Sequence, residues 1–372
     1  MQRDLIVFGE DWGKLPSSTQ HLIKHLQKTR KVLWVNSIGL RQPTLTWRDV
    51  KRVFEKLLAK PKSPSNTEQT FSTQFNVLNP KTIPAPKSRL MRRFASYLLA
   101  KQINPLAQKM GMNAPILWTS LPTAVDMIGR LNESQVVYYC GDDFGGLAGV
   151  DHEVVEQREQ LLVQRADVIL VSSEALQKKL ASPNTYLLPH GVDYQLFSHP
   201  ALVSKLLPQG KPIAGFYGSI SHWLHQPLLA SVISKMPDWN FVFVGKPVVD
   251  ISQLTQFPNV FVFAEVAHDE LPQFSQHWQV SLLPFVDNEQ IRACNPLKLR
   301  EYLATGKPVI STDFPALIPY KGFVTVVDNY IEMVDAIYAS ASSKHNYEQQ
   351  ALVSEEDWSY RANQVELLLS HE

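Results

Sequence analysis

The chain has 372 residues, of which 44% are hydrophobic, and this length is more typical of two domains than of one. Its formal net charge is +1, and no apolar run reaches the length of about 18 residues that a membrane-spanning helix needs. The first residues also lack the charged-then-apolar pattern of a signal peptide. We therefore expect a cytoplasmic protein, and these features argue against an integral membrane protein.

The small net charge conceals an uneven distribution. Residues 41–109 contain fourteen Lys or Arg against three acidic residues, a local charge of +11. Within this region, residues 47–58 and 88–99 place apolar side chains at helical spacing with basic residues between them. Such helices either lie on anionic membrane surfaces or pack against their own domain, and both alternatives stay open. Nucleic acid is not expected as a partner, because no binding motif for it accompanies the charge.

Short apolar runs alternate with helical stretches along the chain, which predicts parallel sheets covered by helices on both faces. A polar link at residues 198–211 separates two series of strands, so we expect two Rossmann-like α/β halves with a cleft between them. Residues 60–70 are expected to form a loop, and the chain from residue 346 onward is acidic and helical. The expected strands are Leu5–Phe8, Val32–Val35, Phe75–Leu78, Ile116–Trp118, Val136–Tyr139, Val168–Val171 and Thr185–Leu188, then Ile213–Tyr217, Phe241–Val244, Val260–Phe263, Val280–Leu283, Val309–Ser311 and Val324–Val327.

Polar residues follow several of these strands. In open α/β sheets ligands bind beyond the carboxyl ends of the strands, so the loop after Leu5–Phe8 is expected to border a ligand, although a serine there can equally cap the next helix. Asp142 and Asp143 close a later strand, where they can bind a metal, position a substrate hydroxyl or cap a turn. His190 lies where the first half passes into the second, and a buried structural histidine is a simpler interpretation than a proton shuttle.

The second half carries two candidate phosphate-binding features, one after its first strand and one in the helix expected before strand Val309–Ser311. Gly218 and Ser219 end its first strand, where a small residue lets the backbone approach a phosphate. No G-x-G-x-x-G motif opens either half, which argues against a dinucleotide-dependent oxidoreductase.

A helix is expected immediately before strand Val309–Ser311. Asn295 is a suitable N-cap, and Pro296 suits the first helical position. The helix is expected to be about ten residues long. Lys298 and Glu301 then share one face, with the cation beside the helix N-terminus and the carboxylate one turn deeper. This arrangement suits the phosphates and ribose of a nucleoside diphosphate, whereas a solvated Lys–Glu pair is the alternative.

Residues 296–309, P-L-K-L-R-E-Y-L-A-T-G-K-P-V, resemble the donor-site helix of GT-B glycosyltransferases of the family-4 type. Segments 136–144, 166–174, 188–193 and 213–219 resemble further motifs of that family in the same order, so the resemblance extends over residues 1 to about 340. It implies a GT-B fold, with an acceptor domain at 1–200, a nucleotide-sugar domain at 201–345, and a helical segment at 346–372 that packs back on the N-terminal domain.

The resemblance also implies a reaction. A retaining enzyme would transfer a sugar from a nucleotide-diphosphate donor to a saccharide or lipid-linked acceptor, in bacterial cell-surface polysaccharide synthesis of the teichuronic acid, capsule or exopolysaccharide type. No cofactor is implied. Metal independence is expected, because the metal-dependent fold class uses Asp-x-Asp whereas Asp142 and Asp143 are adjacent.

Carried over residue by residue, the resemblance assigns roles to this chain. Lys298 and Asp142 are the expected catalytic residues. The donor nucleotide site comprises Gly218, Ser219, Arg292, Asn295, Lys298 and Glu301, and the acceptor side comprises Glu10, Asp11, Trp12, Ser17, Ser18, Asp142 and Asp143.

The chain departs from the family pattern in two places. Ser219 stands where relatives often have an arginine, so Lys298, the helix N-terminus and Arg292 would have to balance the diphosphate. Ala293 stands where the family has its first glutamate, for which Asp287 or Glu289 can substitute, although a solvated loop acid is the simpler interpretation of each. Two other functions therefore stay open: a sugar-nucleotide epimerase of the same fold, and a non-catalytic nucleotide-sugar-binding subunit.

The two cysteines, Cys140 and Cys294, have neither metal-ligand spacing nor the pattern of a disulfide framework. Packing is their simplest role.

Overall fold

The computed structural model describes residues 2–14, 17–37, 71–83, 88–143 and 152–370. The basic helix predicted at 47–58 and the loop predicted at 60–70 lie outside these ranges. The chain divides into two compact units. Unit 1 comprises Met1–Cys140, Phe144–Leu170 and Leu180–Tyr186, and unit 2 comprises Gly141–Asp143, Val171–Lys179 and Leu187–Glu372.

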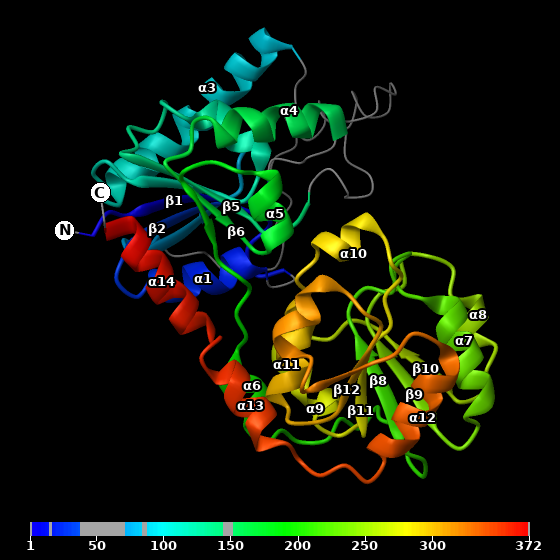
Figure 1. The fold of residues 1–372 in the computed structure, drawn as a ribbon. Helices are drawn as coiled ribbons and strands as arrows, with labels where there is room; N and C mark the ends of the chain where they lie inside the picture. Colours follow the sequence, from blue (N-terminus) through cyan, green and yellow to red (C-terminus); the bar gives the residue numbers. More distant parts are fainter. Residues whose placement is uncertain (1, 15–16, 38–70, 84–87, 144–151, 371–372) are drawn as a thin grey trace, which may run out of the picture. The chain divides into compact units, whose positions relative to one another are not determined.

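The first sheet has seven strands in the order β3-β2-β1-β4-β5-β6-β7. The pairings of β1 with β2 and β4 are parallel, with Leu5 opposite Val32 and Ile116. Helix α1 covers one face, whereas α3 and α4 cover the other (Figure 1). The strands are β1 (Leu5–Phe8), β2 (Val32–Val35), β3 (Phe75–Leu78), β4 (Ile116–Thr119), β5 (Gln135–Cys140), β6 (Val168–Val171) and β7 (Thr185–Leu187), and the helices are α1 (Ser18–Leu26), α3 (Arg89–Lys109), α4 (His152–Val163) and α5 (Glu174–Lys179).

The second sheet has six strands in the order β10-β9-β8-β11-β12-β13, and it lies within unit 2. Helices α7, α8 and α12 form one layer against it, and α9, α11 and α13 form the other (Figure 1). The strands are β8 (Ile213–Tyr217), β9 (Asn240–Val244), β10 (Val260–Phe263), β11 (Val280–Leu283), β12 (Val309–Ser311) and β13 (Val324–Val326). The helices are α6 (Tyr194–Ser198), α7 (Gln226–Lys235), α8 (Ser252–Thr255), α9 (Pro272–Ser275), α10 (Glu289–Ala293), α11 (Leu297–Ala304), α12 (Tyr330–Ser340), α13 (Tyr347–Ser354) and α14 (Trp358–Ser370).

Both sheets are buried at their centres, which is why their strands are continuous apolar runs in the sequence. All four residues of β1 are 0% exposed. In unit 2 the indole of Trp278 packs directly against Gly215 of β8, where a Cβ atom would lie only 1.8 Å from the ring. Every expected strand is present, with ends that differ by at most one residue.

Among the described residues, none of the helices combines the length and apolar character that crossing a membrane requires.

Candidate functional site

The loop that follows β8 begins with Gly218 and Ser219, the residues predicted to approach a phosphate. Gly218 has a φ of 120°, in the region that favours glycine. A Cβ atom at this position would lie 2.7 Å from Nζ of Lys298. The backbone conformation therefore favours glycine here, and any larger residue would also have to displace the flexible end of the lysine side chain.

Lys298 lies in the first turn of α11, and three aromatic rings surround its ammonium group. The Nζ atom lies 4.9 Å from the ring centroid of Phe216, 4.8 Å from that of Trp223 and 5.8 Å from that of Phe285. Burial by these neighbours lowers the pKa of Lys298 to about 8. Among the described residues no carboxylate lies within ion-pair distance of this ammonium, so its charge is available to an anionic ligand.

Glu301 lies one turn deeper on α11, and its side chain is buried. The Tyr217 hydroxyl donates a hydrogen bond to Oε2 at 2.7 Å, and Nε2 of His268 lies 2.8 Å from Oε1. Each carboxylate oxygen keeps a second lone pair, so Glu301 can still accept from a ligand hydroxyl. Burial, followed by the negative charge of Glu301, holds the pKa of Tyr217 well above its usual range, so this phenol stays a donor.

Asp142 and Asp143 belong to unit 2, as do the residues of α11. Asp142 keeps contact with solvent. Its pKa is nevertheless raised, first because surrounding protein atoms reduce the hydration of the carboxylate and then because of the negative charge of Asp143. The pKa of the Cys294 thiol is raised to about 12 by burial and then by Asp142, whereas Lys298 acts to lower it. The charges of Asp142 and Lys298 are thus both close enough to Cys294 to influence its thiol. Asp143 forms an ion pair with Lys179 of α5.

The prediction that Asn295 caps α11 is wrong. The helix begins at Leu297, its N-cap is Pro296, and no side chain accepts a hydrogen bond from its first turn. The Asn295 amide instead donates to the Ser172 carbonyl at 2.7 Å and accepts from Nη1 of Arg300 at 2.6 Å. Helix α11 is accordingly eight residues long rather than ten. A binding role for Asn295 toward nucleotide stays a prediction.

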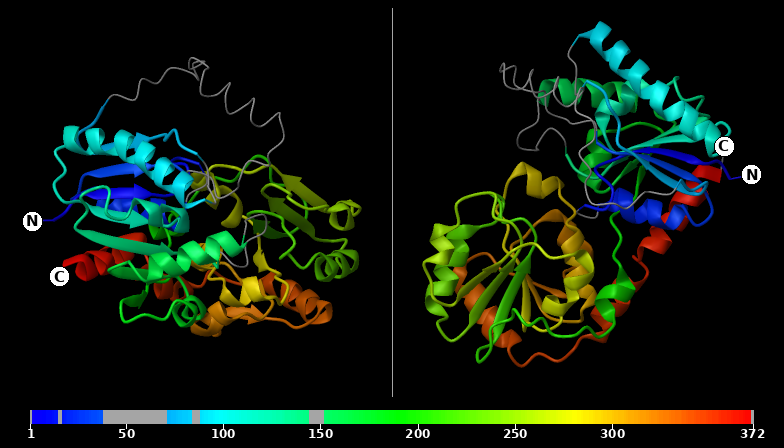
Figure 2. Two further views of the ribbon diagram at one scale, coloured as in Figure 1. Left: turned by 90° about the horizontal axis from the view of Figure 1, so that it is seen from above. Right: turned by 180° about the vertical axis from the view of Figure 1, so that it is seen from behind.

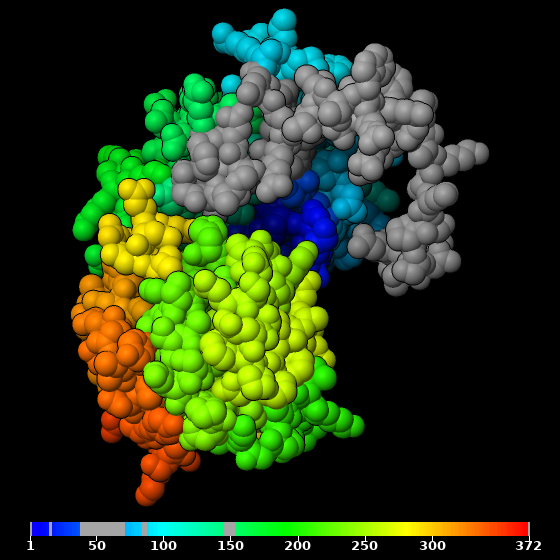
Figure 3. Space-filling model, turned by 90° about the vertical axis from the view of Figure 1, so that its right-hand side faces the viewer, coloured from blue at the N-terminus to red at the C-terminus, as the bar shows by residue number. Residues whose placement is uncertain are grey.

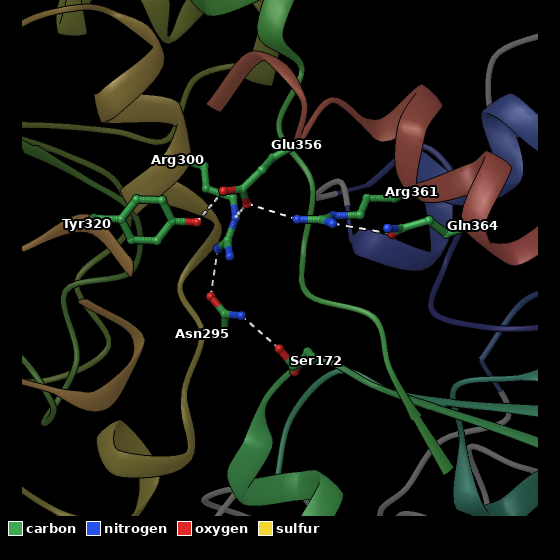
Figure 4. A network of polar contacts seen from close by, with 7 residues as sticks. All are labelled: Ser172, Asn295, Arg300, Tyr320, Glu356, Arg361 and Gln364. Carbon is green, nitrogen blue, oxygen red and sulfur yellow. Dashed lines mark hydrogen bonds and ion pairs between the residues drawn. The ribbon is translucent and has the colours of Figure 1, made fainter. Parts of the chain in front are cut away.

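Figure 4 shows the polar network to which Asn295 belongs. At its centre the carboxylate of Glu356 accepts hydrogen bonds from the Arg300 guanidinium, from Nη2 of Arg361 at 2.9 Å and from the Tyr320 hydroxyl at 2.6 Å. The side chains of Arg300 and Glu356 are only 4% and 18% exposed, so this ion pair is weakly screened by solvent. The network fixes α11 to the start of α14.

His190 is buried next to this network. Burial, and then the positive charges of Arg300 and Arg361, lower the pKa of His190 to about 3. The imidazole is therefore neutral near pH 7, which agrees with a structural histidine and argues against a proton shuttle.

Arg292 lies on α10 and is exposed, and its guanidinium forms a two-contact ion pair with Asp287, with both N–O distances 2.7 Å. These two residues help to line a pocket of about 590 Å³ in unit 2, together with His225, Asp313 and Lys321. Gly218, Lys298 and Glu301 do not line this pocket. The role of Arg292 with a diphosphate stays a prediction.

In unit 1 the candidates after β1 form a local hydrogen-bonded loop. Ser17 is the N-cap of α1, its side chain accepting from the Gln20 amide, and its hydroxyl also donates to Glu10. Asp11 pairs with Lys14 at 2.6 Å, and Ser18 is buried. The ring of Trp12 packs on those of Trp34 and Phe75, with both centroid distances 4.7 Å. Their assignment to an acceptor stays a prediction.

Sequence reasoning missed Tyr217 and His268, which hold Glu301, and the three aromatic rings around Lys298. Tyr217 directly precedes Gly218, so its proximity to the loop could have been expected. No sequence signal marks His268, which lies in a short 3-10 turn after β10. In the described part of the chain, no group of three His, Cys, Asp or Glu residues is placed to hold a metal ion.

Comparison with known proteins bears directly on this site. Residues 211–342 match the family model described as "Glycosyl transferases group 1". This segment includes β8, α11 and the Gly218, Lys298 and Glu301 cluster. The resemblance expected from the sequence is thereby confirmed.

One curated relative is TuaH of Bacillus subtilis (strain 168), whose name assigns it to teichuronic acid biosynthesis as a glycosyltransferase. It is 28% identical over 221 residues, which cover 54% of this chain and 56% of TuaH. The chain thus matches about half the length of this relative.

Solved structures resemble the whole chain. Anabaena HepE, determined in complex with UDP-glucose, has a TM-score of 0.70 at 15% identity, with both chains covered to 100%. A UDP-forming α,α-trehalose-phosphate synthase from Burkholderia xenovorans has a TM-score of 0.62 at 13% identity, covering 100% of this chain and 99% of its own. The expected GT-B fold, with two Rossmann-like parallel-sheet domains, is confirmed.

Proposed function

We propose that this protein is a retaining glycosyltransferase that moves a sugar from a nucleoside-diphosphate donor to a saccharide or lipid-linked acceptor in cell-surface polysaccharide synthesis. The observation that carries the proposal is the Gly218, Lys298 and Glu301 cluster, which lies inside the segment that matches group 1 glycosyl transferases. In this proposal residues 1–200 bind the acceptor and residues 201–345 bind the donor.

The diphosphate would lie between the Gly218 backbone and the first turn of α11. Without a side chain at 218, a phosphate oxygen can approach the backbone, while the helix N-terminus and the Lys298 ammonium supply positive charge. The pKa of about 8 leaves most Lys298 side chains charged at pH 7, and a bound phosphate would raise it further.

The ribose would bind at Glu301. Tyr217 and His268 hold the carboxylate in one orientation, which lowers the entropic cost of binding a hydroxyl pair. The donor nucleotide we favour is UDP, because it is named in the complexes of structural neighbours such as HepE.

Catalysis would depend on stabilising the departing diphosphate. As the glycosidic bond breaks, negative charge grows on the phosphate oxygens, and Lys298 with the α11 N-terminus interacts more strongly with that charge in the transition state. The leaving diphosphate would itself accept the acceptor proton in a front-face attack. This mechanism needs no enzyme nucleophile and would keep the anomeric configuration. Asp142 would then position the acceptor hydroxyl.

Metal independence belongs to the same proposal, since a helix terminus and a lysine would replace a divalent cation. The acceptor class rests on the name of TuaH, a teichuronic acid biosynthesis glycosyltransferase.

The deciding experiment is calorimetric titration with UDP, GDP, TDP and CMP, followed by turnover of the matching radiolabelled nucleotide sugar with saccharide acceptors. We expect one nucleoside diphosphate to bind, and label to appear in the acceptor. Conversion of the sugar nucleotide to an isomer without acceptor would indicate an epimerase. Binding without any turnover would indicate a non-catalytic subunit.

A further inference from the structure

Helix α3 exposes an unusual number of large apolar side chains. Leu90 is 76% exposed, Met91 44%, Phe94 51% and Tyr97 47%. Leu90, Phe94, Tyr97 and Lys101 follow one another at intervals of four, three and four residues, so they form a stripe along one side of the helix. We call the surface formed by Leu90, Met91, Phe94 and Tyr97 the α3 outer face.

The opposite side of α3 provides the packing that the helix needs. Ala95, Leu99, Ile103 and Ala107 are buried against unit 1. Arg92 also points inward, and its guanidinium forms a two-contact ion pair with Asp126, with Nε 2.9 Å from Oδ2. Of the two alternatives left open for residues 88–99, packing on their own domain accounts for the smaller apolar side chains but not for the largest ones, which face outward.

The charge of α3 is strongly positive. Its 21 residues include five basic side chains and no acidic one, and within the described part of the chain Arg92 alone of these five has an ion-pair partner. Arg89 and Arg93 border the outer face on one side, and Lys101 continues the stripe with its Nζ 5.1 Å from the Tyr97 ring centroid. The start of α3 extends beyond the body of unit 1 (Figure 2), and its side chains stand out at the top of Figure 3.

We propose that the α3 outer face binds the surface of a bilayer that contains anionic lipid. Insertion of Leu90, Phe94 and Tyr97 at the boundary between headgroups and acyl chains would remove their apolar area from water. Arg89, Arg93 and Lys101 would then lie at the level of the anionic headgroups. A soluble polyanion would use only the basic residues and leave the apolar stripe in water, so the observations favour a membrane. This inference rests on unit 1 alone and does not depend on the transfer reaction.

The test is sedimentation of the full-length chain with vesicles of pure phosphatidylcholine or of phosphatidylcholine with phosphatidylglycerol, at low and high salt. Two double variants test the apolar and the electrostatic contributions to binding separately. Leu90→Gln with Phe94→Gln removes the apolar side chains, and Arg89→Glu with Arg93→Glu reverses the positive charge. Matched controls change exposed residues elsewhere: Leu202→Gln, at 86% exposure, and Lys24→Glu on α1 with Lys28→Glu just after it. Circular dichroism and UDP titration establish that each variant is folded and binds nucleotide.

We expect binding to anionic vesicles that falls steeply with salt, and a loss of about tenfold or more in partition coefficient for each α3 variant, with little change in the controls. The proposal is overturned if the wild type does not bind anionic vesicles at low salt. The proposal is also overturned if the Arg89 and Arg93 variant loses vesicle binding while the Leu90 and Phe94 variant binds fully. That result would mean that the basic residues are attracted to any polyanion and that the apolar stripe does not insert. UDP binding that persists in either case leaves the proposed function standing.

Discussion

Arg300 and Glu356 lie 56 residues apart in the sequence, and their side chains form a nearly buried ion pair that ties α11 to the chain just before α14. Lys298 and Glu301 flank Arg300 on the same short helix. The orientation of the candidate donor site is therefore coupled to the C-terminal segment through this pair.

Replacing Glu356 should destabilise unit 2. The Glu356→Gln substitution leaves the Arg300 and Arg361 guanidiniums without their counter-charge, and loss of one partner from a buried pair costs about 3 kcal/mol. Urea unfolding monitored by fluorescence measures this change. Glu355→Gln, an exposed neighbour, is the matched control and should change the free energy of unfolding by less than about 0.5 kcal/mol. Equal stability of the two variants would contradict a structural role for the network.

Lys298→Ala should lower kcat more than it raises KM, because the diphosphate gains charge as the glycosidic bond breaks. Steady-state kinetics with the preferred nucleotide sugar tests this. Lys235→Ala, an exposed lysine at the end of α7, should behave like the wild type. An effect of Lys298→Ala on KM alone would remove the lysine from transition-state stabilisation.

The affinity for UDP should depend on pH through Lys298. Its pKa in the free protein, about 8, is below the ordinary value of 10.5, so the ammonium loses its proton as pH rises through 8. UDP affinity should fall only slightly between pH 7 and 7.5, then approach a tenfold loss per pH unit well above pH 8. Calorimetry from pH 7 to 10 measures this profile. If the Lys298→Ala variant keeps the same profile, another group is responsible.

Glu301→Gln should weaken UDP binding by about 2 kcal/mol, the value of a hydrogen bond to a charged group. The glutamine keeps an oxygen for Tyr217, so the fold should be retained. A sharper comparison uses 2′,3′-dideoxy-UDP, which lacks the ribose hydroxyls. Wild type should prefer UDP over the dideoxy analogue, whereas the variant should bind both about equally. An unchanged preference would place the ribose elsewhere.

Gly218→Ala should abolish most UDP binding, since the new methyl group occupies the space of the Lys298 ammonium and strains a φ of 120°. Gly210→Ala is the matched control, because Gly210 also has a positive φ, 87°, but has open space around it. It should lose about 1 kcal/mol of stability and keep its UDP affinity. Equal UDP affinities in the two variants would show that position 218 does not contact the donor.

Activity should survive EDTA, because Lys298 and the α11 N-terminus can balance the diphosphate without a metal. The turnover assay with and without chelator decides this. Complete loss with EDTA and recovery with manganese or magnesium would instead indicate that Asp142 and Asp143 are metal ligands.

The strands were predictable because each is a short apolar run between polar segments, such as Leu5–Phe8 or Ile213–Tyr217, and because these runs alternate with helical stretches. The Lys298 and Glu301 pair was also visible, since their spacing of three follows from helical geometry. The role of Asn295 could not be seen in the sequence, because its side-chain amide bonds to Ser172 and Arg300, and Ser172 is 123 residues away.

Long-range polar contacts of this kind leave little trace in one sequence. His268 reaches Glu301 from a turn that shows no periodicity, and Glu356 meets Arg300 only after the chain has passed through α12 and α13. For α3, the helical spacing was evident, but which face was buried depended on the strands beneath it and on the Arg92 pairing with Asp126.

The two cysteines give the protein a practical property. Cys140 is fully buried, and the pKa of Cys294, about 12, keeps that thiol protonated near pH 7, where only a thiolate reacts readily with maleimides. A third cysteine placed on an exposed position such as Lys28 or Leu202 should therefore accept a fluorophore selectively in the otherwise native chain. Site-specific labelling of either unit becomes possible without first removing a natural thiol.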